Sequence, residues 1–133
     1  MQSGVTHKVD ITGTKLPGGT YDVVMANHVL EHIPDDRAAM RELHRLLKPG
    51  GTALLTVPIN ATRQATYENP AIQTPADRWA HFSAHDHLRY YGMDFAERLT
   101  EAGFQVETFR MPPEDEVRHG LLRDEWITIA RKP

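Results

Sequence analysis

Two apolar runs on either side of an amphipathic segment form the clearest pattern in this chain. Residues 23–26 and residues 53–57 are almost continuously apolar, which is typical of strands buried on both faces of a parallel sheet. Between them, apolar residues recur at helical spacing over residues 36–47, on a face centred on Leu43. The order strand, helix, strand predicts a right-handed βαβ unit with parallel strands.

Residues that cap helices and form turns mark the ends of these elements. We expect Asp35 or Asp36 to begin the helix, because a carboxylate there accepts from free backbone amides. Residues 49–51, Pro-Gly-Gly, are expected to end it. Pro58 closes the second strand.

The rest of the chain adds shorter elements. Residues 5–12 predict a short strand, whereas residues 59–87 lack periodicity, and a stretch of that length is usually functional or mobile. Helical patterning resumes over residues 93–102. Residues 104–109 and 126–130 predict two strands paired as an antiparallel ribbon. The fold class is therefore α/β, with a mostly parallel sheet and a terminal antiparallel strand pair.

Composition narrows the class of protein. The chain has 133 residues, of which 40% are hydrophobic and 25% charged, as in an ordinary globular domain. A net charge of −3 gives no reason to expect a nucleic acid or membrane partner. The absence of cysteine excludes disulfides and thiolate chemistry. Without a signal peptide or an apolar run near the roughly 20 residues of a membrane helix, a cytoplasmic protein is expected.

Candidate chemistry gathers where the first apolar strand ends. Ligands of open α/β sheets bind outside the carboxyl ends of the strands, which is the position of Asn27 and His28. The Asn27 amide can donate and accept, or can simply bond the local backbone. His28 is the candidate general base, since imidazole exchanges protons near neutral pH. Glu31 and His32 are expected to orient the turn that follows.

A second group of polar residues is His81, His85 and His87, with Asp86 among them. Imidazoles and a carboxylate can ligate zinc, iron or nickel, but the usual spacings of metalloenzymes are absent. We assign no metal ligand and interpret the segment as part of an active-site lid. Nearby aromatic residues form either a wall for an apolar acceptor or ordinary packing: Trp79, Phe82, Tyr90 and Tyr91.

Four pieces of the sequence resemble a known family. They are residues 9–11 (Val-Asp-Ile), 22–32 (from Asp-Val-Val to Leu-Glu-His), 45–51 (Arg-Leu-Leu-Lys-Pro-Gly-Gly) and 101–104 (Glu-Ala-Gly-Phe). In this order they resemble the class I S-adenosylmethionine-dependent methyltransferases of the type-11 group, with a Rossmann-like sheet. The resemblance covers residues 7–132.

The resemblance implies S-adenosylmethionine as cofactor and a small molecule as methyl acceptor. It implies four cofactor-binding residues: Asp10, Ile11, Asn27 and His28. Asp10 would accept from the adenine amino group, and Asn27 would contact the methionine part. Methyl transfer is an in-line displacement that depends on proximity more than on a base, so no catalytic residue is assigned beyond the candidate His28.

The chain departs from the family before the first apolar strand. The family's glycine-rich loop and its ribose-binding acid have no counterpart, because Gly18-Gly19 and Gly50-Gly51 lie at other points of the fold. Residues 1–133 are therefore expected to form one truncated methyltransferase domain with impaired activity. The alternatives are a non-catalytic binding or assembly module, and a metal protein built on residues 81–87.

Truncation also predicts the oligomeric state. In the family, another strand lies beside residues 21–26, so the strand predicted there keeps an unpaired edge unless residues 7–12 fill it. Unpaired edges and uncovered apolar faces seek partners. We therefore expect a homodimer, the commonest closed assembly.

Overall fold

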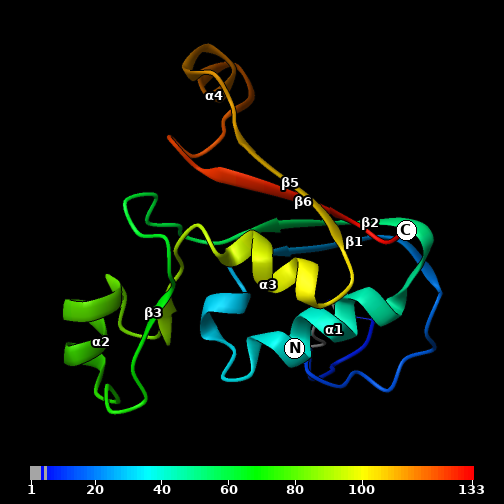
Figure 1. Cartoon of the computed structure of the whole chain (residues 1–133), viewed down its shortest axis with the longest axis horizontal. Coiled ribbons are helices and arrows are strands. Elements are labelled where there is room, and N and C mark those ends of the chain that lie inside the picture. The colour runs from blue at the N-terminus through cyan, green and yellow to red at the C-terminus, as the bar shows by residue number, and fades with distance from the viewer. Residues whose placement is uncertain (1–3, 5) are drawn as a thin grey trace.

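The structure, a computed structural model, describes residue 4 and residues 6–133. Figure 1 shows a sheet with helices against it, a smaller unit of β3, β4 and α2 to one side, and α4 at the tip of a long strand pair. In chain order the elements are β1 (Tyr21–Asn27), the 3₁₀ turn η1 (Leu30–His32), α1 (Asp36–Leu46), β2 (Leu47–Thr56), β3 (Tyr67–Glu68), α2 (Pro75–Phe82), β4 (Arg89–Tyr90), α3 (Phe95–Glu101), β5 (Gln105–Arg110), α4 (Pro113–His119) and β6 (Trp126–Arg131).

The main sheet has the strand order β1-β2-β6-β5. β1 and β2 are parallel, and β6 runs antiparallel to both of its neighbours, so that β1, β2 and β5 point the same way. The α/β class and the terminal antiparallel pair predicted from the sequence are confirmed. The carboxyl ends of β1 and β2 coincide, because Asn27 lies opposite Thr56.

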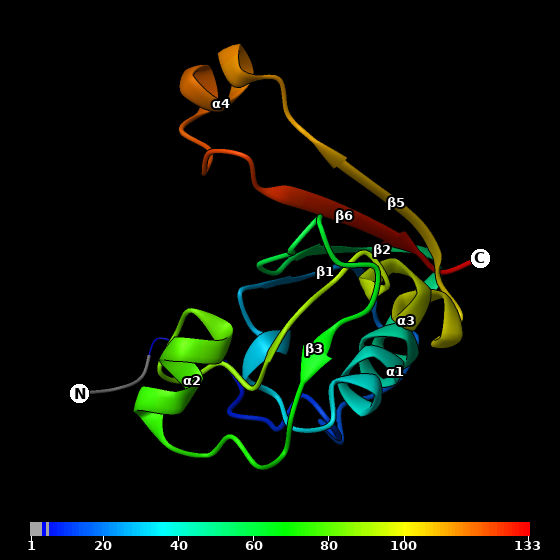
Figure 2. The ribbon, with the colours of Figure 1, turned by 60° about the vertical axis from the view of Figure 1, so that its left-hand side comes forward.

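α1 forms where its pattern predicts, but it ends at Leu46, and residues 49–51, which were expected to end it, lie inside β2. The Asp35 carboxylate accepts a 2.9 Å hydrogen bond from the Ala38 amide, which caps the helix. Leu43 is only 5% exposed on the apolar face. α1 and α3 lie side by side against one face of the sheet (Figures 1 and 2), and their side chains fill the core beneath it.

The opposite face of β1 is open, and the prediction that residues 23–26 are buried on both faces is wrong. Val24 and Ala26 face the core, but Val23 is 53% exposed and Met25 is 64% exposed. Successive strand residues point to opposite faces, and α1 and α3 pack against only one of them. Apolar side chains therefore lie on an uncovered surface.

The strand predicted over residues 5–12 is also wrong for its described part, residues 6–12; Val5 lies outside the described residues. Asp10 Oδ1 accepts from the backbone amide and the hydroxyl of Thr12 at 2.8 and 2.7 Å. The amide of Gly13 donates to the Asp10 carbonyl at 3.0 Å. A short polar side chain that bonds the following backbone favours a turn over a strand.

The non-periodic residues 59–87 contain more regular structure than the sequence predicts. α2 begins at Pro75, and the Thr74 hydroxyl caps it by accepting from the Asp77 amide at 3.1 Å. β3 pairs with β4, which follows this segment. Among the helices of the described residues, none combines the length and apolar character needed to span a membrane.

Candidate cofactor and acceptor site

The carboxyl ends of β1 and β2 are tied together by polar contacts. The His28 amide donates to the Thr56 carbonyl at 2.9 Å. The Thr56 hydroxyl lies 3.3 Å from Asn27 Oδ1 and donates to it. Asn27 is exposed, and among the described residues its side-chain nitrogen donates no hydrogen bond, so its protons are available to a ligand. The sequence prediction that Asn27 and His28 stand at this edge of the sheet is confirmed by the bounds of β1.

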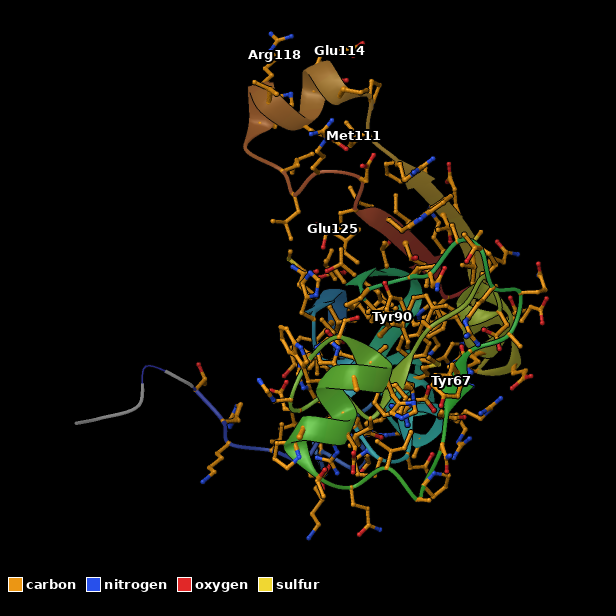
Figure 3. The ribbon with its side chains drawn as sticks, turned by 90° about the vertical axis from the view of Figure 1, so that its left-hand side faces the viewer. Tyr67, Tyr90, Met111, Glu114, Arg118 and Glu125 are labelled. Carbon is orange, nitrogen blue, oxygen red and sulfur yellow. The ribbon has the colours of Figure 1, made fainter. Side chains whose placement is uncertain are left out.

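His28 has a positive φ of 52°, which a residue with a side chain adopts at a cost that the surrounding structure must offset. The turn aims its ring at two carboxylates. Nε2 lies 2.6 Å from Glu125 Oε1, and Nδ1 lies 3.4 Å from Glu31 Oε1. Glu125 comes just before β6, and Figure 3 shows it between the α4 protrusion and the body of the molecule. Sequence reasoning missed this partner, which is 97 residues from His28 and carries no local signal.

His28 also lines a small pocket of about 210 Å³. Its walls come from the ends of β2, β4 and the segment before β6, namely Val57, Pro58, Ile59, Tyr90, Leu122, Arg123, Asp124, Glu125 and Trp126. A larger pocket of about 490 Å³ is lined by Pro34, by the end of β3 and the residues after it, and by the start of β4, and neither Asn27 nor His28 lines it. Of the two pockets, the smaller one contains the imidazole of His28 and the carboxylate of Glu125.

Asp10 and Ile11 lie in the turn that precedes β1. Hydrogen bonds from the Thr12 side chain, and then from its backbone, hold the pKa of Asp10 below its ordinary value. The carboxylate is exposed and charged, and Ile11 is half-buried against the core. Among the described residues, no hydrogen bond joins this turn to Asn27 or His28.

Glu31 occupies an unusual position in η1. It is 1% exposed, and neither carboxylate oxygen has a hydrogen-bond partner among the described residues. Besides His28, His32 Nε2 lies 3.8 Å and His87 Nε2 3.9 Å from Glu31 Oε1. The expectation that the Glu31 side chain orients the turn by hydrogen bonds is not met among the described residues, although its backbone carbonyl accepts from the Leu88 amide at 2.9 Å.

The three histidines of the second polar group do not gather. His81 Nδ1 is 2.9 Å from the Tyr67 hydroxyl, whereas His85 Nδ1 is 3.1 Å from the Pro75 carbonyl and its ring stacks on Trp79. Only His87 turns toward η1, and burial is the main cause that lowers its pKa.

The predicted aromatic wall is likewise divided. Phe82 and Tyr91 are buried in packing, Trp79 is 58% exposed, and Tyr90 alone reaches the pocket beside His28.

Comparison with known proteins agrees with the arrangement of this sheet. A family model described as "Methyltransferase domain" matches residues 3–108. The chain therefore belongs to the methyltransferase-domain family, within the class I S-adenosylmethionine-dependent methyltransferases.

Individual relatives are longer than this chain. It is 30% identical over 117 residues to a ubiquinone biosynthesis O-methyltransferase of Marinobacter nauticus, covering 73% of the chain and 48% of the relative. It is 25% identical over 123 residues to a ubiquinone/menaquinone biosynthesis C-methyltransferase of Vibrio parahaemolyticus, covering 91% and 44%. The chain thus spans less than half the length of these two relatives.

A solved structure shows the same fold. It is a Burkholderia thailandensis 1,6-didemethyltoxoflavin-N1-methyltransferase with bound 1,6-didemethyltoxoflavin and S-adenosylhomocysteine. The TM-score is 0.59 at 22% identity, and the match covers 92% of this chain and 48% of that one.

Proposed function

We propose that this chain forms part of the site of an S-adenosylmethionine-dependent methyl transfer to a small molecule. The observation that carries the proposal is the exposed pair Asn27 and His28, at the joined carboxyl ends of β1 and β2 and beside a pocket. Membership of the methyltransferase-domain family supports it, as does the S-adenosylhomocysteine bound in the similar Burkholderia thailandensis structure.

The residues present fit the cofactor in part. Asp10 keeps an exposed, charged carboxylate, whose Oδ2 takes no part in the bonds to Thr12 and can accept from an amino group. The free amide nitrogen of Asn27 can donate to a carboxylate or a hydroxyl. Ile11 offers apolar surface beside Asp10. The cofactor supplies an electrophilic methyl group on a sulfonium; the chain holds and orients it.

His28 is placed to act on the acceptor. Nδ1 faces the buried Glu31 carboxylate at 3.4 Å, whereas Nε2 shares a 2.6 Å hydrogen bond with Glu125, which lines the same pocket as His28. An oxygen or nitrogen acceptor that gains a methyl group must lose a proton, and a neutral imidazole can take it. In this proposal His28, paired with Glu125, acts as the general base, and the acceptor's proton is taken up by that pair.

Calorimetric titration with S-adenosylmethionine and S-adenosylhomocysteine tests the proposal on the chain as it stands. We expect weak binding or none at micromolar concentrations, since a glycine-rich loop and a ribose-binding acid are absent from these 133 residues. Any heat of binding observed at higher concentration should fall in Asp10→Ala and Asn27→Ala, but not in the distant control Glu107→Ala. Micromolar affinity, about 8 kcal/mol, would contradict the impaired site.

A second candidate function is a non-catalytic binding or assembly module. The exposed Val23 and Met25 favour it, because an apolar strip on an edge strand suits protein contact more than chemistry. This alternative predicts self-association without any response to either cofactor form. For both candidate functions, a cytoplasmic location remains a prediction from the sequence.

A further inference from the structure

The carboxylate of Glu31 is buried without a hydrogen bond, and that arrangement requires an explanation. Burying a charged group that lacks a partner is costly, and buried polar atoms in native proteins almost always find one. Three imidazole nitrogens from two separate segments surround Oε1 instead: His28 Nδ1 at 3.4 Å, His32 Nε2 at 3.8 Å and His87 Nε2 at 3.9 Å. Both carboxylate oxygens stay without a hydrogen bond within the described part of the chain.

The outer nitrogens of two rings show where their protons lie. His32 Nδ1 is 3.3 Å from the Asp86 carbonyl, which can only accept, so this nitrogen carries the hydrogen. His28 Nε2 donates to Glu125 in the same way. In the neutral rings, the nitrogens that face Glu31 therefore present lone pairs to a carboxylate oxygen. Lone pairs that converge on one carboxylate oxygen repel each other unless a cation, either a proton or a metal ion, lies between them.

We propose that Glu31, His32 and His87 form a binding site for a divalent transition-metal ion of the zinc type. One ligand atom from each residue lies within 4.8 Å of the others. Ligands about 2.0–2.2 Å from a tetrahedral zinc ion are roughly 3.4 Å apart. The two histidine–Glu31 separations of 3.8 and 3.9 Å must therefore close by about half an ångström, and the widest separation in the group by at most about 1.4 Å. Two imidazoles and one carboxylate favour zinc, iron, cobalt or nickel over magnesium or calcium.

The surroundings resemble those of built metal sites. A metal-binding histidine usually donates its other ring N–H to a carbonyl or carboxylate, and His32 does so at Asp86. The hydrogen bond from the Leu88 amide to the Glu31 carbonyl holds the two segments together without the ion. Three protein ligands are the number that leaves a position for water or substrate, and His28 Nδ1 lies 3.4 Å from the Glu31 ligand oxygen. The site does not depend on cofactor binding.

Metal titration of the full chain tests this proposal directly. After removal of metal with a chelator, ZnCl₂ is added and followed by calorimetry, and CoCl₂ is added and followed by visible absorption. We expect one zinc ion per chain with a Kd of about 1 μM or tighter, and the intense absorption of four-coordinate cobalt. Glu31→Gln and His87→Ala should each weaken zinc binding by more than the roughly 10–100-fold that loss of an outer hydrogen-bond partner costs.

Matched controls separate the site from general histidine binding. His81→Ala and His85→Ala remove imidazoles that lie outside the cluster, and both should keep the zinc affinity of the unmodified chain. If Glu31→Gln does not fold, as judged by circular dichroism, the partly exposed His87 still provides the test. The proposal is overturned if the chain binds no stoichiometric zinc, or if the control variants lose as much affinity as His87→Ala.

Discussion

Arg98 Nη1 donates a 2.7 Å hydrogen bond to Asp36 Oδ2, and the two side chains are only 6% and 5% exposed. The Tyr91 hydroxyl donates to the same oxygen at 2.7 Å, and Arg98 also reaches Glu68 at 3.0 Å. Burial alone would raise the pKa of Asp36, but the bond from Tyr91 and the charges of Arg89 and Arg98 outweigh it and lower that pKa. The network joins the first turn of α1 to α3, β3 and β4.

Arg98→Met should destabilise the fold by about 3–5 kcal/mol, because it leaves the Asp36 carboxylate buried without one of its cations. Urea denaturation gives the change in the free energy of unfolding. The matched control is Arg37→Met, whose 3.2 Å pair with Glu101 is exposed on both sides and should contribute about 1 kcal/mol or less. Equal losses in the two variants would show that the buried network does not stabilise the fold.

Leu43→Ala should lower the free energy of unfolding by about 2–5 kcal/mol, the usual effect of emptying a buried leucine site. Leu43 is 5% exposed and packs in the core under the sheet. Leu122, which is 61% exposed, provides the control, and its change to alanine should cost no more than about 0.5 kcal/mol. A negligible shift of the denaturation midpoint for Leu43→Ala would mean that the packing of α1 differs from this structure.

The stability of the chain should fall in acid through Glu42. Hydrogen bonds from Arg45 and, less strongly, from Thr14 lower the pKa of Glu42 to about 2 from 4.5, although burial opposes them. A carboxyl group with a lowered pKa in the folded state contributes stability above its unfolded pKa and loses it as the pH falls toward the folded value.

Denaturation midpoints of the unmodified chain and of Glu42→Gln measure this contribution. The two proteins should differ most near pH 6, and the difference should shrink as the pH falls from about 4.5 toward about 2. A difference that is constant over this range would show that the Glu42 charge does not stabilise the fold.

Local sequence patterns predicted most helices and strands of the main sheet, but they did not predict contacts between residues that are far apart in the sequence. α1 follows from the cap at Asp35 and the apolar spacing around Leu43, which are properties of one segment. The exposure of Met25 was missed because an apolar strand does not show which elements will cover it. The strand end at Asn27 was predicted from its neighbours in the sequence, and the sheet topology places it opposite Thr56 at the carboxyl end of β2.

The partners of the candidate site residues were beyond sequence reasoning for a physical reason. Glu125 meets His28 only because β6 returns beside β2 after a long excursion through α4. His87 meets Glu31 through a backbone bond between segments that share no periodic pattern. Side-chain contacts of this kind depend on the complete packing of the chain, which single-sequence patterns do not contain.

The exposed edge of β1 should make the chain a homodimer. β1 pairs on one side with β2, and no described strand pairs with its other edge. Light scattering at several concentrations should give twice the mass of one chain, and Met25→Lys should shift it toward the monomer, since a lysine on an edge strand discourages pairing. Leu122→Lys changes an equally exposed apolar residue elsewhere and should leave the dimer intact. A monomeric mass at every concentration would contradict this prediction.

The most direct test of the proposed cofactor site is a nuclear magnetic resonance titration of the ¹⁵N-labelled chain with millimolar S-adenosylhomocysteine. It locates weak binding residue by residue. We predict saturable shifts at the backbone amides of Asp10, Ile11, Asn27 and His28, which Asp10→Ala weakens. Shifts confined to the larger pocket beside Pro34 and β3, or no shifts at all, would contradict the assignment of the cofactor site to the carboxyl ends of β1 and β2.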